Sequence, residues 1–483
     1  MTDSFDVAVI GGGPAGVTAA LRARELGASV ALAERGNLGG TCTNDGCVPT
    51  RVLAHAARLA RDAEQYEEYG LHGEAPQVDF VRLLNRVQRI VYEVQQKKQL
   101  RSRLEAADVH VFDRAGDARF VDGNTLALGD GTKLRADKFI LCAGGHARRL
   151  PLPGSDLALT HSDVWTMKEL PDSVAIIGGA ATGCQLASVF AAFGARVALL
   201  EAAPRILGAE DEVVSEGVTG AFLERGIEVV TGIGGVEGIE KSGDVLRLFY
   251  WRDGERHSLD AGAVVLAVGW PGNAEGLNPE AAGVEAERGY VIVDDSLRTS
   301  APHVFAAGDV TGRRMLVQSA THEGSLAAER AVLGGVRGFR HDIVPHGGFT
   351  DPEYGSVGLT EIQASMDHDF VASIVPYADL DRGVIDGRSD GFCKLIVDRA
   401  SRRILGAHIV GEQAVEVVQI AATAMRAGMT VEQLADVELA YPTFTAVVGL
   451  AARSAVSDLG MVAASPENGA PERTRAVEWE HRG

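Results

Sequence analysis

The sequence predicts an α/β protein in which two units of the Rossmann type precede a separate α+β domain. Residues 5–10 form a short apolar run that ends in the glycine-rich turn GGGPAG and leads into an Ala/Leu/Arg-rich helix. The same strand–turn–helix–strand pattern returns at residues 174–201, and two such units indicate two nucleotide-binding halves. From about residue 345 the pattern changes to strands with two helices, at 412–427 and 443–457.

The first unit is predicted to bind a dinucleotide. Gly11, Gly13 and Gly16 have GxGxxG spacing directly after a strand, where glycine lets the backbone approach a pyrophosphate held by the helix N-terminus. The second strand, Ser29–Ala33, is closed by Glu34, whose carboxylate is placed to accept hydrogen bonds from ribose hydroxyls. Because glycine-rich turns also simply connect strands to helices, the prediction depends on strand, helix and Glu34 together.

The second unit carries a variant of the same pattern, Gly178-x-Ala180-x-x-Gly183, and Glu201 closes its second strand. Ala180 in place of the middle glycine narrows the approach to phosphate. Glu201 favours an unphosphorylated ribose because its carboxylate repels a 2′-phosphate, whereas Arg205 nearby offers that phosphate a partner. We therefore predict NADH, with NADPH as the second choice and a purely structural turn as the alternative.

Further predicted elements connect and extend the two units. An amphipathic helix is expected around residues 79–106, and a strand at Lys138–Cys142 precedes a Pro/Gly-rich joint, Leu150–Gly154. Buried strands are also expected at Ala263–Val268 and Val304–Ala307. These features divide the chain into the first part of one nucleotide-binding domain at 1–150, a second nucleotide-binding domain at 151–270, a central segment of the first domain at 271–344, an α+β domain at 345–460, and a tail at 461–483 whose composition predicts disorder.

Composition and charge narrow the possible partners. The chain has 483 residues, a net charge of −20 and an isoelectric point near 5.1, so its surface repels nucleic acids and anionic lipids. No apolar stretch reaches the roughly 18 residues of a membrane span. The first residues lack the basic segment of a signal peptide. We therefore expect a cytoplasmic protein that binds neither nucleic acid nor membrane.

Cys42 and Cys47 lie in the segment TCTNDGCVPT and are predicted to be a redox-active pair. A structural disulfide disagrees with a reducing compartment, and a zinc site needs two more ligands of similar spacing, which are not visible. Two ordinary buried thiols remain the alternative for this spacing alone, but the position directly after a dinucleotide unit favours the redox interpretation. The other cysteines are expected in the core: Cys142, Cys184 and Cys393.

Together these segments resemble the flavin-dependent pyridine nucleotide–disulfide oxidoreductase family. The resemblance is to class I members, such as dihydrolipoamide dehydrogenase and mercuric reductase, and covers about residues 5–460. It rests on GGGPAG, GGTCTNDGCVPT, the second unit, AVGWPGN, VFAAGDVTG and AYPTFTA. It implies FAD on the first unit, NAD(P)H on the second, and a C-terminal domain that builds a homodimer and completes a substrate site at its interface.

The resemblance also implies roles for individual residues. Cys47 would face the flavin and Cys42 would be the outer, interchange thiol. Asp309 would contact the ribityl chain of FAD. The flavin would carry the redox step while the protein positions and tunes it. Further cofactor contacts are expected from Arg35, Gly40, Thr41, Gly144, Gln185, Gly269 and Gly308.

Two departures from the family pattern concern charge and proton transfer. Where the family has Lys after the CxxxxCxP motif and a partner Glu in the second unit, this chain has Arg51 and Gln185, so the positive charge stays but hydrogen-bonds differently. Where disulfide-reducing members have His and Glu, this chain has Tyr441 and Ala446. A general base that titrates near neutral pH is therefore missing. Tyr441 is either a poor substitute or a packing residue at the dimer interface.

These observations predict an FAD-dependent NAD(P)H oxidoreductase with Cys42, Cys47, Arg51 and Tyr441 at its catalytic centre and no metal. The leading hypothesis passes electrons from nicotinamide through flavin to the cysteine pair and on to a disulfide-type or other small acceptor. Two alternatives stay open: an NAD(P)H:quinone or acceptor reductase or transhydrogenase working directly at the flavin, and a flavin-binding redox sensor. The paired C-terminal cysteines and N-terminal CxxC domain of mercuric reductases are not visible in the sequence.

Overall fold

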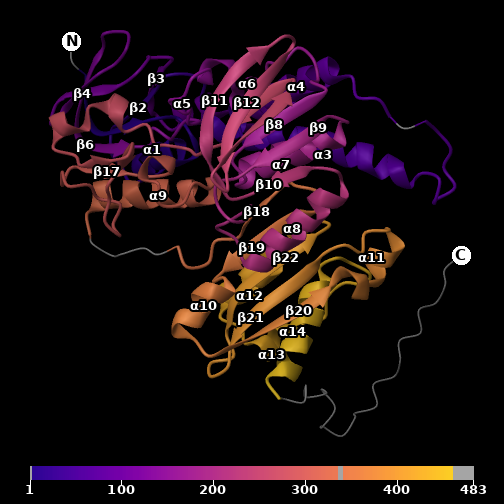
Figure 1. The fold of residues 1–483 in the computed structure, drawn as a ribbon. Helices are drawn as coiled ribbons and strands as arrows, with labels where there is room; N and C mark the ends of the chain where they lie inside the picture. Colours follow the sequence, from indigo (N-terminus) through magenta and orange to yellow (C-terminus); the bar gives the residue numbers. More distant parts are fainter. Residues whose placement is uncertain (1–2, 75, 336–340, 461–483) are drawn as a thin grey trace, which may run out of the picture.

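The first glycine-rich turn follows a strand of the first sheet, and this sheet lies beside the second sheet in Figure 1. The structure is a computed structural model that describes residues 3–74, 76–335 and 341–460. The elements of this part are β1 (Asp3–Ile10), α1 (Pro14–Glu25), β2 (Val30–Glu34), β3 (His110–Asp113), β4 (Arg119–Asp122), β5 (Thr125–Ala127), β6 (Lys133–Leu141), β17 (Val304–Ala306) and α9 (Val317–Leu333). The strand order is β3-β2-β1-β6-β5-β4, and β17 pairs in parallel with the end of β6. A segment from the middle of the chain therefore returns to the first sheet, where α9 packs against α1.

The second sheet is entirely parallel and has the strand order β10-β9-β8-β14-β7. A three-stranded antiparallel sheet, β11-β12-β13, packs on one of its faces, and the core between the two contains Ala175, Val264 and Leu248. The elements are β7 (Leu159–Thr160), β8 (Ser173–Ile177), α7 (Ala181–Ala192), β9 (Arg196–Leu200), α8 (Glu212–Glu224), β10 (Glu228–Val230), β11 (Ile233–Ser242), β12 (Val245–Arg252), β13 (Glu255–Ala261) and β14 (Ala263–Leu266).

The C-terminal part is an antiparallel sheet of order β18-β19-β22-β21-β20 with helices packed on it. In Figure 1 it lies below the first and second sheets, and α8 lies between it and the second sheet. This α+β arrangement confirms the predicted fold class. The elements are β18 (His346–Gly348), β19 (Glu353–Gly358), α10 (Glu361–Asp367), β20 (Phe370–Pro376), α11 (Asp381–Ile385), β21 (Phe392–Asp398), β22 (Ile404–Gly411), α12 (Ala414–Ala427), α13 (Val431–Ala435) and α14 (Ala446–Asp458).

Four helices carry and surround the predicted redox segment: α2 (Gly40–Asn44), α3 (Cys47–Asp62), α4 (Phe80–Lys98) and α5 (Leu100–Ala106). Helix α4 buries the side chains of Phe80, Leu84, Val87 and Val91, a spacing that places them on one face of a helix. This face packs with α3 and α7 in one core cluster. Helices α3 and α4 therefore pack on the second sheet through α7 and the side chains of β8, β9 and β14.

The prediction of one continuous helix at 79–106 is wrong in its middle. Gln99 has a φ of 47° and ends α4, and α5 begins at the next residue. A left-handed residue turns the chain because it cannot continue the helical hydrogen-bond pattern. The strand expected at 138–142 begins earlier, at Lys133, and Cys142 comes directly after its end. The expected tail at 461–483 lies outside the described residues, and among the described helices none is long and apolar enough to cross a membrane.

Candidate functional site

The first glycine-rich turn joins β1 to α1, and its geometry requires glycine at two positions. Gly11 has a φ of 103°, and a Cβ atom there would lie 2.2 Å from the carbonyl oxygen of Cys142. A Cβ atom at Gly16 would lie 1.7 Å from the carbonyl oxygen of Gly11. Gly13 is the N-cap of α1, and within the described part of the chain no side chain caps this helix. Its first N–H groups therefore point at an open site suited to an anion.

Glu34 ends β2 and is held beside this turn by the backbone. Its carboxylate accepts hydrogen bonds from the N–H groups of Gly12 at 2.6 Å and Gly36 at 2.7 Å. A carboxylate has about four acceptor sites, so Glu34 is fixed in place while further acceptor positions remain. The neighbouring Arg35 is exposed, and its guanidinium lies 3.7 Å from the carboxylate of Asp117.

The second turn, between β8 and α7, repeats the first. Gly178 has a φ of 105°, and a Cβ atom there would lie 2.3 Å from the carbonyl oxygen of Ala267. A Cβ atom at Gly183 would lie 1.8 Å from the carbonyl oxygen of Gly178. Glu201 accepts a hydrogen bond from the N–H of Gly179 at 2.6 Å. The two units are therefore alike in backbone geometry as well as in sequence.

The second unit differs from the first in two side chains near its phosphate position. Ala180, the N-cap of α7, is exposed. The guanidinium of Arg205 donates to the carbonyl oxygens of Leu207, Gly208 and Glu210 at 3.3, 3.0 and 2.9 Å. Three of the five N–H donors of Arg205 therefore hold its own loop, which leaves this guanidinium less available to a 2′-phosphate.

The segment after the first unit covers the N-terminus of α1. Gly40 has a φ of 60°, and a Cβ atom there would lie 2.7 Å from the Cα atom of Gly13. Thr41 comes next, in the short helix α2. Gly144, after β6, has a φ of 67° and open space where its Cβ would lie, and its carbonyl oxygen accepts from the N–H of Asn273 at 3.0 Å. These loops bring backbone, without side chains, to the same end of the first sheet.

Asp309 lies after β17 at that same end of the sheet. Its carboxylate accepts a hydrogen bond from the indole N–H of Trp270 at 3.1 Å, and burial raises its pKa above the usual value. The N–H of Gly308 donates to the buried carboxylate of Glu323 at 2.7 Å. The carbonyl of Gly269 accepts from the N–H of Arg148, which holds the turn before Trp270.

Cys42 lies in α2 and Cys47 is the first residue of α3, and both are thiols in this structure. A hydrogen bond from Cys42 lowers the pKa of the Cys47 thiol to about 7, although burial opposes this effect, and the backbone N–H of Cys47 itself assists it. The same hydrogen bond raises the pKa of Cys42. The pair thus contains one thiol and one group that readily becomes a thiolate near neutral pH.

The remaining cysteines confirm the sequence prediction that they belong to the core. Cys142, Cys184 and Cys393 are at most 6% exposed, and burial raises the pKa of each thiol. A buried thiol with a raised pKa is a poor nucleophile. Only Cys42 and Cys47, of the five cysteines, therefore have the geometry of a reactive pair.

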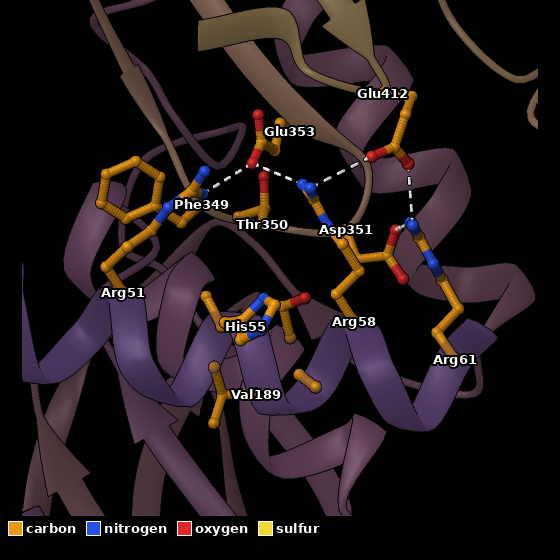
Figure 2. A pocket seen from close by; sticks show the side chains of 13 residues that line it. Arg51, His55, Arg58, Arg61, Val189, Phe349, Thr350, Asp351, Glu353 and Glu412 are labelled. Atoms are coloured by element: carbon orange, nitrogen blue, oxygen red, sulfur yellow. Dashed lines mark hydrogen bonds and ion pairs between the residues drawn. The ribbon is translucent and has the colours of Figure 1, made fainter. Parts of the chain in front are cut away.

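Arg51 lies one turn beyond Cys47 on α3, but its guanidinium reaches toward the C-terminal part. Its Nη1 atom lies 2.7 Å from a carboxylate oxygen of Glu353, and its guanidinium stacks 4.4 Å from the centre of the Phe349 ring. Figure 2 shows this contact within a ladder of three arginines from α3 and three carboxylates, around a cavity of about 160 Å³. The members of the ladder are Arg51, Arg58, Arg61, Asp351, Glu353 and Glu412.

Gln185, on α7, contacts the same segment as Arg51 without pairing with it. Its Oε1 atom accepts a hydrogen bond from the N–H of Phe349 at 3.1 Å, and its Nε2 atom donates to the carbonyl of Ala181. The Lys–Glu ion pair expected from the family is thus replaced by two separate contacts to residues around Phe349. The catalytic role predicted for Arg51 and the cofactor contact predicted for Gln185 stay predictions.

Tyr441 is 76% exposed on the C-terminal part and pairs with a residue that the sequence did not single out. Its hydroxyl donates a hydrogen bond to the carboxylate of Asp381, at the start of α11. This hydrogen bond raises the pKa of the Tyr441 hydroxyl above its usual value. Ala446 begins α14 and supplies no carboxylate, so the pair formed here is Tyr–Asp and contains no imidazole.

The residues present fit two dinucleotides. Each helix N-terminus, at α1 and α7, is uncapped by any described side chain, and each is followed in sequence by a backbone-held glutamate, Glu34 or Glu201. A side chain at Gly13 would enter the space at the N-terminus of α1 beside Gly40. Within the described residues, no group of three or more His, Cys, Asp or Glu suits a metal ion.

Several contacts of this site were not evident from sequence. They involve Lys98, Trp270, Glu353 and Asp381, which reach the site from elements far apart in the chain. Only Trp270 had a signal, because it lies inside the AVGWPGN segment. The others are ordinary charged residues whose partners become visible only in the fold.

Comparisons with known proteins agree with this geometry. Residues 5–324 match the pyridine nucleotide-disulphide oxidoreductase family, and residues 344–452 match the dimerisation domain of the same family. The chain is 32% identical to mercuric reductase of Lysinibacillus sphaericus over 95% of this chain and 84% of that protein. It is 33% identical to dihydrolipoyl dehydrogenase of Geobacillus stearothermophilus over 93% of this chain and 95% of that protein.

Solved structures of related proteins have the same fold as this chain. The HOCl-induced flavoprotein disulfide reductase RclA from Escherichia coli superimposes with a TM-score of 0.82 and 28% identity, covering 92% of this chain and 99% of that chain. Its Cu(II) complex superimposes with a TM-score of 0.83 and the same identity. The chain therefore belongs to the pyridine nucleotide-disulphide oxidoreductase family and is an FAD-dependent oxidoreductase that uses NAD(P)H.

Proposed function

We propose that the chain is a homodimeric, NADH-dependent flavoenzyme that delivers two electrons through Cys42 and Cys47 to a small acceptor without a histidine base. The observation that carries this proposal is the hydrogen-bonded pair of Tyr441 and Asp381. It stands where disulfide-reducing members of the family have a His. A hydroxyl that already donates to a carboxylate can hold a neighbouring group but does not readily accept a proton.

The first unit is assigned to FAD and the second to NADH. The N-termini of α1 and α7 would hold the two pyrophosphates, and Glu34 and Glu201 would accept hydrogen bonds from ribose hydroxyls. Bound FAD supplies the two-electron exchange between the nicotinamide and the cysteine pair. The choice of NADH rests on Glu201, which repels a 2′-phosphate, and on Arg205, whose donors are engaged by backbone carbonyls.

Cys42 and Cys47 would carry the electrons as a dithiol–disulfide pair. Two electrons and two protons convert the disulfide to the dithiol, and reoxidation gives both electrons to the acceptor and releases both protons. Cys47 loses its proton first, since its pKa is lowered to about 7 by the hydrogen bond from Cys42. The Cys42 proton must leave during reoxidation, and a His base would act in this step.

Tyr441 is poorly suited to that step because Asp381 raises the pKa of its hydroxyl. Disulfide acceptors also need a proton for their departing sulfur, so glutathione disulfide and lipoamide are expected to react slowly. Quinones and metal ions take electrons without a departing sulfur. The names of two relatives, mercuric reductase and the Cu(II) complex of RclA, support including Hg(II) and Cu(II) among the acceptors that are tested.

Rapid-mixing measurements of the two half-reactions test this proposal. NADH should reduce the flavin quickly, whereas the reduced enzyme should react with glutathione disulfide or lipoamide at least about 10²-fold more slowly. A Tyr441→His variant should narrow this gap, and Tyr441→Phe should leave it unchanged. Disulfide turnover as fast as flavin reduction in the parent enzyme would contradict the proposal.

Cysteine variants separate the proposal from its alternatives. Cys42→Ser should lose most turnover with the best acceptor of the panel while NADH still reduces the flavin. If Cys42→Ser keeps full turnover with a quinone, the acceptor reacts directly at the flavin and the cysteine pair is not on the path. Negligible turnover of the parent enzyme with every acceptor would instead favour a redox sensor.

A further inference from the structure

The guanidinium of Arg51 contacts Glu353 in the C-terminal part. The question is therefore which other cation lies near the redox cysteines. Arg51 has its closest contacts with Glu353 at 2.7 Å and with the ring of Phe349, both in the C-terminal part. Another cation approaches from the opposite side, at the last residue of α4. This cation is Lys98.

The end of α4 is clamped onto the short helix that contains Cys42. The Nζ atom of Lys98 donates a hydrogen bond to the hydroxyl of Thr43 at 2.7 Å, and Thr43 is fully buried. One turn earlier, the side-chain amide of Gln95 donates to the side-chain oxygen of Asn44 at 2.6 Å. Thr43 and Asn44 lie between the two cysteines in sequence, so both contacts fix the end of α4 on the segment that joins the pair, and the first of them holds the ammonium group of Lys98 there.

We propose that Lys98 is a positioning residue that supplies the positive charge beside the redox pair and favours the thiolate form of Cys47. This inference rests on the proposed function of Cys42 and Cys47. It gives Lys98 the place that the family resemblance suggested for Arg51. A compact ammonium that is hydrogen-bonded to a buried hydroxyl is held at one place on the segment that joins Cys42 to Cys47.

The charges that face the cysteine pair agree with this assignment. The charge of Lys98 lowers the pKa of both thiols, whereas the carboxylate of Asp309 raises the pKa of both. On the other side of the α2–α3 turn, Asp45 lies 3.5 Å from the imidazole of His161. Lys98 is therefore the cation that offsets Asp309, and its removal should make the Cys47 thiolate less favourable.

The position of Lys98 also has an ordinary structural explanation, which is the helix dipole of α4. Basic residues in the last turn of a helix are stabilised by the helix dipole whatever else they do, and both Lys97 and Lys98 occupy the last turn of α4. Lys97 is exposed, whereas Lys98 is half-buried. Lys97→Met is therefore a matched control that removes an equal charge from the same turn without touching Thr43.

The test is a pH titration of the two-electron-reduced holoenzyme under anaerobic conditions, monitored by its long-wavelength absorbance and by the rate of iodoacetamide alkylation. In Lys98→Met the midpoint of the titration should move up by about one pH unit. Lys98→Arg should restore most of the parent profile because it keeps the charge. Lys98→Gln, which keeps a donor for Thr43 but no charge, should behave like Lys98→Met, and Lys97→Met should match the parent enzyme.

Each outcome decides a different point. A parent midpoint shared by Lys98→Met and Lys98→Gln would overturn the role of Lys98, as would an equal shift in Lys97→Met. A shift in Lys98→Met that Lys98→Gln abolishes would show that the hydrogen bond to Thr43, and not the charge, is responsible. A parent enzyme that shows neither a long-wavelength band nor alkylation at the pair would overturn the proposed function itself.

Discussion

The two nucleotide units of this chain share a backbone geometry but differ in the segment that each second strand leads into. Gly11 and Gly178 have φ values of 103° and 105°, and Glu34 and Glu201 each accept a 2.6 Å hydrogen bond from a glycine N–H. In the first unit, the carbonyl of Gly12 accepts from the N–H of Gly39, and the chain continues into the redox helices. In the second unit, the equivalent carbonyl of Gly179 accepts a hydrogen bond from the N–H of Leu207, in a loop that leads to α8.

Because of this difference, the same strand–turn–helix geometry is enclosed in the first unit and exposed in the second. Gly40 packs over Gly13 at the N-terminus of α1, and this enclosure suits the proposed binding of a cofactor that stays bound. The N-cap of the second unit, Ala180, is exposed, which suits a substrate that must enter and leave. Helices α3 and α7 then meet at one segment, where Arg51 contacts Glu353 and Gln185 contacts Phe349.

Matched substitutions at the two N-caps should give the largest contrast. Gly13→Val places a side chain where the phosphate of FAD must approach and where Gly40 packs, so the purified variant should contain little flavin. Ala180→Val should remain yellow and show an increase of about tenfold in the KM for NADH. Flavin absorbance per chain and steady-state kinetics measure the two effects. Full flavin content in Gly13→Val would show that FAD does not bind the first unit.

The glutamate of the second unit should set nucleotide preference. The parent enzyme is expected to have a higher kcat/KM with NADH than with NADPH, and Glu201→Gln should reduce this ratio by about tenfold because a repelling charge is lost. Glu34→Gln, the matched change in the first unit, should lower flavin content without changing the ratio. A parent enzyme that prefers NADPH would contradict the assignment and would return Arg205 to consideration as a phosphate ligand.

The contacts where α3 and α7 meet should give the smallest effects, and these concern stability. Arg51→Met leaves buried Glu353 with Arg58 as its remaining cation and should lower the free energy of unfolding by about 1–2 kcal/mol, since Arg51 is partly exposed. Gln185→Ala loses one hydrogen bond to Phe349 and should cost about 1 kcal/mol. Thermal denaturation of the holoenzyme checks both. A larger loss for Gln185→Ala than for Arg51→Met would reverse the relative importance of these contacts.

Most of the fold could be predicted because its signals are local. A Rossmann unit places its strand, turn and helix within about 30 residues, so the glycines, the apolar runs and Glu34 can be recognised without the rest of the protein. The cysteine pair has the same advantage, since Cys42 and Cys47 lie within one short segment. The helix at 79–106 was predicted as one piece because its apolar periodicity does not reveal the left-handed turn at Gln99.

The partners of charged and hydrogen-bonding side chains could not be predicted from the sequence. Arg51 was predicted at the catalytic centre, where the family has a Lys that pairs with a Glu of the second unit, yet its nearest carboxylate belongs to Glu353, 302 residues further along the chain. Tyr441 stands where the resembled family has His, but its partner Asp381 lies 60 residues before it, at the start of α11. Long, flexible side chains choose among all charges within reach, and that choice depends on how the parts of the fold pack.

The sequence by itself therefore determined the two nucleotide units, because short-range backbone sterics and glycine spacing impose them. It also placed Cys42 and Cys47 within one short segment and showed Tyr441 and Ala446 where the resembled family has His and Glu. Only the tertiary structure decided the electrostatic surroundings of the cysteine pair. The packing of α4 on α2 brings Lys98 to Thr43, and the packing of the C-terminal part on α3 draws Arg51 away. Coulomb interactions fall off with distance in space, not along the chain, so these surroundings exist only once the helices and sheets are assembled.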